Sequence, residues 1–167
     1  MQLLITNIAG YPNRADRLLS LKRNQIWQGS ELKVFNEEIN IQSTKRIQVI
    51  DITGQVLSLV KEMDFKNGVL IINVPHTTAT ITINEYESGL IQDIINLLIE
   101  LFKPDGPWEH NKIDTNAHAH LASSIIGNSK CLLIKNGSVN LGTWQKILLI
   151  ELDGPRRRRV DIGFIGE

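Results

Sequence analysis

Helical patterns occupy the middle of the chain, and strand patterns flank them on both sides. Residues 53–63 repeat apolar side chains at helical spacing, and residues 85–102 form the longest helical pattern. Alternating or β-branched apolar runs, which are typical of strands, cover residues 33–42, 46–51, 69–75, 76–85, 130–135, 138–152 and 158–165. This order predicts an α+β domain with a largely antiparallel sheet and two or three helices.

The stretch "HTTATITINE" has polar residues at both ends of an apolar strand pattern. Its middle alternates alanine and isoleucine with threonine, which indicates one buried face. His76 opens the stretch, and Asn84 and Glu85 close it. Asn84 is expected to cap the following helix and Glu85 to neutralise its N-terminus, as Thr53 is expected to cap the earlier helix. The same positions are well placed to line a pocket.

Residues 1–31 are predicted to be a loosely structured extension of a domain that covers residues 32–167. Neither a helical nor a strand period is sustained there, and "AGYPN" and "QGS" are turn or linker sequences. The first 30 residues carry four basic side chains and one acidic one, although the whole chain carries 18 of each. A nucleic-acid-binding arm is the alternative interpretation, but the zero net charge and the lack of interleaved aromatic residues favour a chain without a nucleic-acid partner.

The apolar runs are too short or too often interrupted to predict a membrane span, and no secretory signal pattern opens the sequence. We therefore expect a cytoplasmic protein. Cys131 is the only cysteine, which excludes an internal disulfide. Within "KCLLIK" it is predicted to be a small buried strand residue rather than a reactive thiol.

All four histidines, His76, His110, His118 and His120, fall within a window of 45 residues, in loops or at the ends of elements. Three imidazoles with a carboxylate can bind a zinc ion or transfer protons. His118 and His120 are two residues apart, so on a helix at most one of them faces a shared site. The pattern leaves two alternatives, a histidine-lined site and ordinary surface histidines.

The run "GPRRRR" introduces a strand with four consecutive arginines. Alternation places Arg157 and Arg159 on one face and Arg156 and Arg158 on the other. Arginines that face a pocket suit a phosphate or carboxylate group, whereas the alternative is a charged, solvated edge strand.

The segment "GTWQ" is predicted to lie inside a strand, where its glycine indicates a bulge or a close backbone approach. Trp144 can stack on a heteroaromatic ring while the Gln145 amide binds the edge of that ring. A purely structural role for Trp144 in the core is the alternative.

In this order, the motifs "HTTATITINE", "WEHN", "NAHAHLASSIIG", "GTWQ" and "GPRRRR", with the terminal Gly-Glu, resemble the YjbQ family, whose members are often described as secondary thiamine-phosphate synthases. The resemblance covers about residues 32 to 167 and implies a homotrimer of α+β subunits with sites near the subunit interfaces. Matching the motifs position by position implies catalytic roles for His76, Glu85, His110 and His120. It also implies substrate-binding roles for Asn84, Asp114, Trp144, Gln145 and Arg158. His118 does not match the family pattern.

The activity that the resemblance implies is the condensation of hydroxymethylpyrimidine diphosphate with a thiazole phosphate, with release of pyrophosphate. Arg158 and a divalent metal ion, zinc or magnesium, would then stabilise the leaving diphosphate, and Trp144 would stack on the pyrimidine. His76, His110 and His120 are the implied metal ligands. The expected partner is a phosphorylated or heteroaromatic small molecule.

Two other functions fit the same residues. One is a metal-dependent hydrolase with Glu85 as its base, and the other is a non-catalytic trimeric protein that binds a metabolite. A fully extended strand would separate His76 from Asn84 by about 26 Å. Either the chain bends after Thr77, or the two ends serve sites on different subunits.

Overall fold

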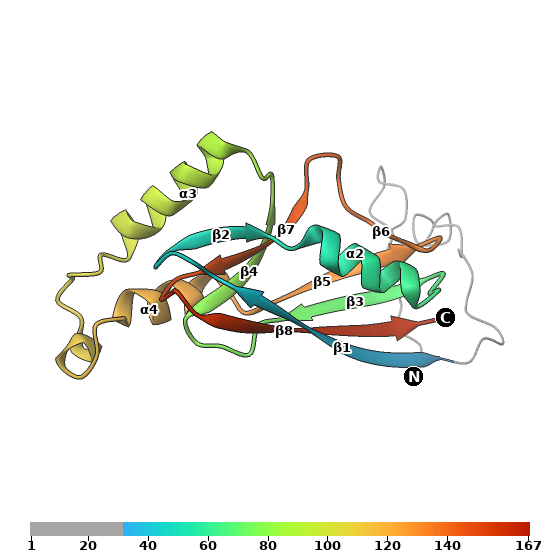
Figure 1. The fold of residues 1–167 in the computed structure, drawn as a ribbon, viewed down its shortest axis with the longest axis horizontal. Helices are drawn as coiled ribbons and strands as arrows, with labels where there is room; N and C mark the ends of the chain where they lie inside the picture. Colours follow the sequence, from blue (N-terminus) through green and yellow to red (C-terminus); the bar gives the residue numbers. More distant parts are fainter. Residues whose placement is uncertain (1–31) are drawn as a thin grey trace, which may run out of the picture. The chain divides into compact units, whose positions relative to one another are not determined.

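The computed structural model describes residues 32–167, so the predicted extension at residues 1–31 lies outside the described residues. Strands open and close the described part of the chain, and the helices lie between them in sequence, as Figure 1 shows. The elements, with their bounds, are β1 (Lys33–Gln42), β2 (Gln48–Asp51), α2 (Thr53–Glu62), β3 (Gly68–Asn73), β4 (Ala79–Asn84), α3 (Ser88–Leu101), the 3-10 helix η1 (Glu109–Lys112), α4 (Ala117–Ile126), β5 (Ser129–Lys135), β6 (Ser138–Val139), β7 (Lys146–Glu151) and β8 (Arg157–Gly166).

The strands divide between two sheets. Sheet A has five strands in the order β1-β8-β3-β5-β6, and sheet B has three in the order β2-β7-β4. Every neighbouring pair is antiparallel. The α+β class, the antiparallel strands and the three α-helices of residues 32–167 confirm the predicted fold class.

Two apolar clusters hold the sheets and helices together. The larger one joins the inner faces of both sheets to α2, and its fully buried members include Ile52, Leu70, Ile81, Leu149 and Phe164. The smaller one lies where α3 and α4 pack against the other face of sheet B, around Leu98, Ala119, Leu148 and Ile150. Sheet B is therefore covered on both faces. Among residues 32–167, no helix is long and apolar enough to cross a membrane.

The two predicted helix caps were wrong. Thr53 is the first residue of α2 rather than its cap; its hydroxyl donates to Asp51 Oδ1 at 2.5 Å and accepts from Ile147 N at 2.8 Å, which joins the helix to β7. Asn84 ends β4, and α3 begins only at Ser88. Glu87 caps α3 by accepting hydrogen bonds from Gly89 N and Leu90 N, and these bonds lower the pKa of its carboxyl group.

Three further expectations about the strands need correction. The chain does turn at Thr77 and Thr78, so that His76 precedes β4 instead of opening it. The segment "GTWQ" lies in the loop between β6 and β7 and not inside a strand. Cys131 is exposed, because alternation along β5 turns it to the uncovered face of sheet A.

Candidate functional site

A chain of hydrogen bonds joins His110 to a carboxylate through an amide. His110, on η1, is exposed, and its Nε2 lies 3.2 Å from Asn116 Oδ1. Asn116 is buried at the start of α4 and donates from Nδ2 to Asp153 Oδ2 at 3.1 Å. Arg156 donates from Nη2 to the same Asp153 oxygen at 2.8 Å. An accessible imidazole is thus connected through Asn116 to groups in the turn between β7 and β8.

These contacts define the tautomer of His110. An ionised carboxylate only accepts hydrogen bonds, so Asp153 must face the amide nitrogen of Asn116, and the amide oxygen faces His110. Nε2 of His110 therefore carries a proton, and in the neutral ring Nδ1 has a free lone pair. Burial opposes the charge of Asp153, but the hydrogen bonds from Asn116 and Arg156 outweigh it and lower the pKa of this carboxyl group. The arrangement presents Nδ1 of His110 as a base.

His120 and Asp114 lie near His110. The rings of His110 and His120 meet edge to face with their centroids 4.9 Å apart. Asp114 is exposed in the loop before α4, where its Oδ1 accepts from Thr115 N at 2.6 Å. Arg46, in the connection between β1 and β2, donates from Nη2 to the carbonyl oxygen of Thr115 in this loop at 3.1 Å. We call His110, Asp114, Asn116, His120 and Asp153 the histidine group.

His76 is held in a different tautomer. Its Nε2 accepts the backbone N–H of Arg159 at 3.0 Å, so the proton of the neutral ring lies on Nδ1. Burial, together with the charges of Arg158 and Arg159, lowers the pKa of His76. Neutral His76 therefore offers an Nδ1–H donor, and protonation of Nε2 would break its bond to the backbone.

Arg158 is buried in an ion pair with Glu151. Its Nε and Nη2 donate to the two carboxylate oxygens at 2.7 and 2.5 Å, and Nη2 also donates to Thr78 Oγ1 at 2.9 Å. The Glu151 carboxylate further accepts from Ser43 Oγ at 2.9 Å and from Asp153 N at 2.8 Å. Burial opposes the ionisation of Glu151, but the contacts with Arg158, the Asp153 N–H and Ser43 together outweigh it and lower the pKa of Glu151. The pair fixes the segment after His76 and the turn that holds Asp153.

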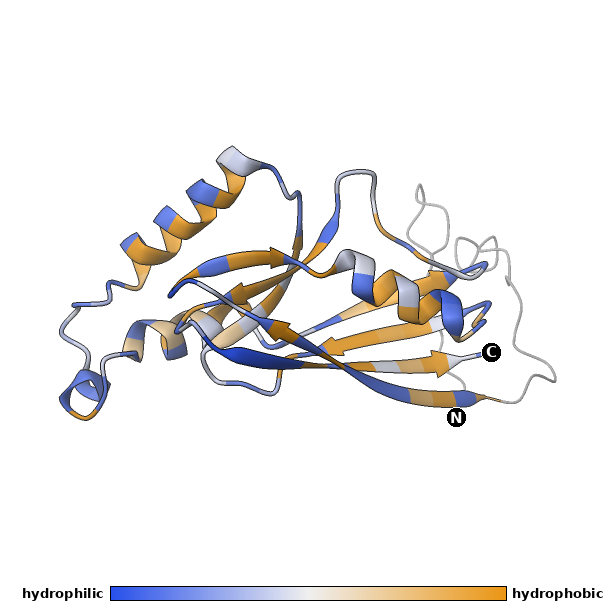
Figure 2. Cartoon of the chain, in the orientation of Figure 1, coloured by the Kyte–Doolittle hydropathy of each residue, from blue (hydrophilic) through white to orange (hydrophobic). Residues whose placement is uncertain are grey.

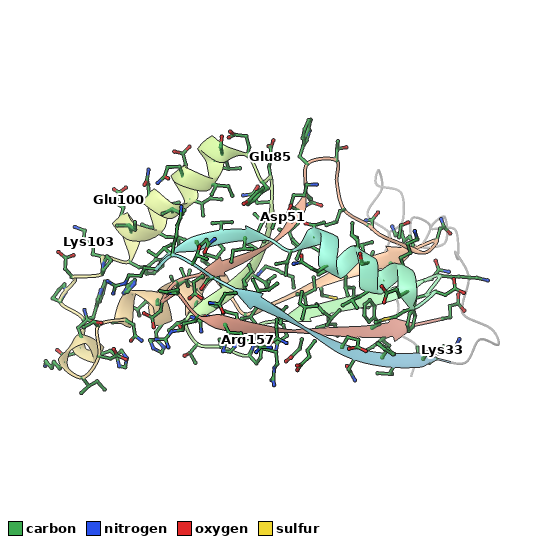
Figure 3. All side chains as sticks on the ribbon, viewed as in Figure 1. Lys33, Asp51, Glu85, Glu100, Lys103 and Arg157 are labelled. Carbon is green, nitrogen blue, oxygen red and sulfur yellow. The ribbon has the colours of Figure 1, made fainter. Side chains whose placement is uncertain are left out.

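The remaining predicted residues lie at the end of sheet B where β4 ends and β7 begins, opposite to the end that carries Glu151. Asn84 ends β4 directly opposite Lys146, the first residue of β7, so Gln145 and Trp144 in the preceding loop lie at the same sheet end. Trp144 is 70% exposed. Figure 3 shows Glu85 where the chain leaves β4 for α3. We call Asn84, Glu85, Trp144 and Gln145 the strand-end group.

One subunit does not bring the two groups together. Helix α3 begins just after the strand-end group, and η1 with His110 follows its far end (Figure 1). Fourteen residues of α-helix rise about 20 Å. The site residues of one described subunit therefore form two groups at opposite ends of α3, with His76 near the β8 strand.

The donors that the sequence suggested for a metal ion are not clustered. Within residues 32–167, no three His, Cys, Asp or Glu side chains lie close enough together to hold a metal ion. His110 and His120 are adjacent, but His76 is held by the backbone of Arg159. The described residues of a single subunit do not fit the implied zinc or magnesium site.

His118 is a buried residue of α4. It is 2% exposed, and neither ring nitrogen has a hydrogen-bond partner among the described residues. Burial, and then the charge of Arg46, lowers its pKa. His118 and His120 thus face different sides of α4, as their spacing predicted.

Acid should therefore destabilise the protein in part through His118. Below about pH 6.5 His118 is protonated in the unfolded chain but stays neutral in the folded protein. The free energy of unfolding therefore falls as the pH falls. Each such histidine contributes a slope of at most about 1.4 kcal/mol per pH unit. Urea unfolding of wild-type and His118→Leu protein, followed between about pH 7.5 and pH 5.5, should show a shallower slope for the variant. An unchanged slope would exclude this role.

Three residues of the histidine group's surroundings escaped the sequence analysis. Asn116 lies between the more conspicuous Asp114 and His120, and Asp153 lies in a short turn sequence without a recognisable motif. Glu151 looked like the end of an apolar strand. The one available signal was that Glu151 is an acidic residue in an otherwise apolar run, because a buried carboxylate needs a charged partner.

The fold and these residues together define a two-sheet α+β domain with polar side chains at its strand ends. A model of the family described as UPF0047 protein YjbQ-like matches residues 37–167. The chain therefore belongs to the YjbQ (UPF0047) family.

Relatives and solved structures agree with this assignment. A UPF0047 protein of Methanothermobacter thermautotrophicus is 38% identical over 139 residues, which cover 83% of this chain and 97% of the relative. One from Archaeoglobus fulgidus is 42% identical and covers 74% of this chain and 95% of its own length. A crystal structure of a protein of unknown function from Sulfolobus solfataricus superposes with a TM-score of 0.81 at 40% identity, covering 82% of this chain and all of that one.

Proposed function

We propose that the protein is an enzyme that acts on a phosphorylated small molecule, with the histidine group at its catalytic centre. The observation that carries this proposal is the hydrogen-bonded chain from His110 through Asn116 to Asp153. A histidine that acts as a base works best when a hydrogen bond to one ring nitrogen fixes its tautomer and orientation, and Asn116 and Asp153 supply that here. Arg46 and Arg156, which are both exposed beside this chain, supply positive charge for a phosphate group.

Thiamine-phosphate synthesis is the specific reaction that we propose first. The thiazole nitrogen forms a bond to the methylene carbon of the pyrimidine, and the bond from that carbon to the diphosphate oxygen breaks, which releases pyrophosphate. This transfer needs hydrogen-bond donors to the leaving diphosphate rather than a base, so its proposal rests on the family resemblance and not on Nδ1 of His110. The Nδ1–H of His76 is such a donor, and the exposed Trp144 suits stacking on the pyrimidine. Arg158 is less suited to the diphosphate, because Glu151 and Thr78 occupy its Nε and Nη2.

Hydrolysis of a phosphate ester or diphosphate is the second candidate, and the free lone pair on Nδ1 of His110 favours it. With the pyrimidine diphosphate, His110 would take a proton from water while the water oxygen attacks the terminal phosphorus. The bridging oxygen would leave with the pyrimidine monophosphate and take a proton from solvent, and inorganic phosphate would be released. In this proposal His110 takes the role of the base, in place of Glu85.

We propose that the working form is a homotrimer. The two groups of site residues lie at opposite ends of α3 in one subunit. A neighbouring subunit would allow the strand-end group of one copy to complete the histidine group of another.

Phosphorus NMR distinguishes these reactions in one experiment. Purified protein is given both thiamine precursors with magnesium and, separately, the pyrimidine diphosphate alone. The synthase proposal predicts pyrophosphate and thiamine phosphate only when both precursors are present, and His120→Ala should abolish both. Release of inorganic phosphate from the diphosphate alone would support the hydrolase instead. No turnover of these or of a panel of phosphorylated compounds would contradict both and leave a metabolite-binding protein.

A further inference from the structure

The loop between β6 and β7 closes into a turn that displays a tryptophan. Gln145 N donates to the Gly142 carbonyl oxygen at 3.0 Å, and Gly142 N donates in return to Gln145 Oε1 at 2.8 Å. A Cβ atom at position 142 would lie 3.4 Å from that amide oxygen, so the glycine leaves room for the glutamine side chain. Trp144 lies inside this turn and is 70% exposed. It is therefore not a core residue of its own subunit, and its aromatic face is presented on a turn that two hydrogen bonds hold.

The side-chain amides of Asn84 and Gln145 are oriented in the same way. Asn84 Oδ1 accepts from Glu85 N at 2.9 Å, just as Gln145 Oε1 accepts from Gly142 N. A backbone N–H only donates, so each amide turns its oxygen to the backbone, and its NH2 group has no acceptor among residues 32–167. Asn84 lies directly opposite Lys146, the residue after Gln145, and Figure 2 shows hydrophilic residues where β4 ends and β7 begins. This end of sheet B therefore offers two hydrogen-bond donors to an acceptor.

The charges at this end of sheet B favour a ring over a phosphate group. Glu85 is half-buried and forms no ion pair within residues 32–167. Two more acids lie in the adjoining segments, where Asp51 ends β2 and Glu87 caps α3. Lys146 is the one basic residue in the segments that meet here, residues 49–54, 82–90 and 142–148. Three carboxylates against one ammonium group repel a diphosphate, but they suit a neutral ring with an amino substituent.

We infer that the strand-end group binds an amino-substituted aromatic ring with acceptor nitrogens in the ring, such as an aminopyrimidine. Trp144 stacks on the face of the ring, and the NH2 groups of Asn84 and Gln145 donate to its nitrogens. The Glu85 carboxylate accepts from the amino substituent. The inference rests on the function proposed above, because it assigns the ring of the substrate to the strand-end group and leaves the phosphate to the histidine group of a neighbouring subunit.

Two unphosphorylated compounds test this recognition apart from any chemistry. One is the aminopyrimidine alcohol that lacks the diphosphate, and the other is its benzene analogue, in which C–H groups replace both ring nitrogens. Titration calorimetry with the full chain should show that the pyrimidine binds about ten-fold more tightly or better, because the analogue can stack but cannot accept hydrogen bonds in its ring. Equal affinities for the two compounds, or no binding of the pyrimidine, would overturn the inference.

Isosteric variants test the two amide donors without disturbing the fold. Gln145→Glu and Asn84→Asp each keep an oxygen for the backbone N–H and replace only the NH2 donor with an acceptor. Each should weaken binding of the pyrimidine by about five-fold or more and leave the affinity for the benzene analogue almost unchanged. Wild-type affinity for the pyrimidine in both variants would exclude the amides from recognition.

Trp144→Ala tests the stacking contact, and Thr143→Ala is its matched control. Removing the indole should weaken binding of both compounds by about ten-fold, because both rings stack. Thr143 lies in the same turn, and its side chain forms no hydrogen bond within residues 32–167, so Thr143→Ala should bind both compounds as the wild type does. Wild-type affinity in Trp144→Ala would contradict the stacking contact.

These outcomes are distinguishable from those of the proposed reactions. Selective binding of the pyrimidine by a protein that turns over no phosphorylated compound would support the inference and contradict the proposed enzyme. Turnover of the pyrimidine diphosphate without preference for the ring nitrogens would do the reverse.

Discussion

Replacing Glu151 with alanine should lower the free energy of unfolding by about 3–5 kcal/mol, which is a large part of the stability of a domain of this size. Glu151 is fully buried, and its carboxylate neutralises Arg158, whose side chain is 5% exposed. Without the carboxylate, the guanidinium stays in the interior as an uncompensated charge, because the lost oxygens are its main partners. Urea unfolding at fixed protein concentration measures the loss.

A surface ion pair provides the matched control. Lys112 and Glu109 contact each other at 2.5 Å, but their side chains are 71% and 86% exposed. Glu109→Ala should therefore change the stability by less than about 1 kcal/mol. Combining Glu151→Leu with Arg158→Met removes both buried charges and should restore much of the stability that Glu151→Ala loses. A loss below about 1 kcal/mol in Glu151→Ala would show that solvent reaches the pair.

The substitution His110→Ala should lower turnover of the substrate by about 10²–10⁴-fold if hydrolysis is the reaction, because it removes the base. His110 is exposed on the short η1 helix, so its removal should change the free energy of unfolding little. Initial rates with the pyrimidine diphosphate, measured by release of inorganic phosphate, give the comparison.

Lys112→Ala is the control, since Lys112 lies on the same 3-10 helix and pairs only with the exposed Glu109. It should keep the wild-type rate. Asn116→Ala should lower the rate less than His110→Ala, because the imidazole remains but its tautomer is no longer fixed. Equal rates of phosphate release in wild-type protein and His110→Ala would remove His110 from the mechanism.

The strands were predictable because their patterns depend on neighbouring residues alone. β8 alternates buried and more exposed residues, so the core side chain Phe164 could be assigned to the buried face from the sequence. The alternation of β4 predicted one buried face, but sheet B is covered on both faces, and Thr80 is as fully buried as Ile81. Helix α3 shows the limit of this approach. Its apolar side includes Leu97 and Leu101, which the fold leaves exposed. Periodicity identifies an apolar face but not whether the subunit or a partner covers it.

The candidate site was less predictable, because long-range contacts build it. Asn116 and Asp153 are 37 residues apart, and Glu151 meets Ser43 across a separation of 108 residues. No local pattern pairs such residues. The motifs indicated the histidines, but only the fold shows that His110 and His120 touch while His118 turns inward.

The central claim is that Asn116 and Asp153 present Nδ1 of His110 as a base, and nitrogen NMR of the imidazole tests it most directly. In ¹⁵N-labelled protein at alkaline pH, the His110 spectrum should show a protonated Nε2 and a lone pair on Nδ1. In the Asn116→Ala variant the ring should return to a mixture of tautomers. A wild-type spectrum with the proton on Nδ1 of His110, or the same spectrum in both proteins, would contradict the claim.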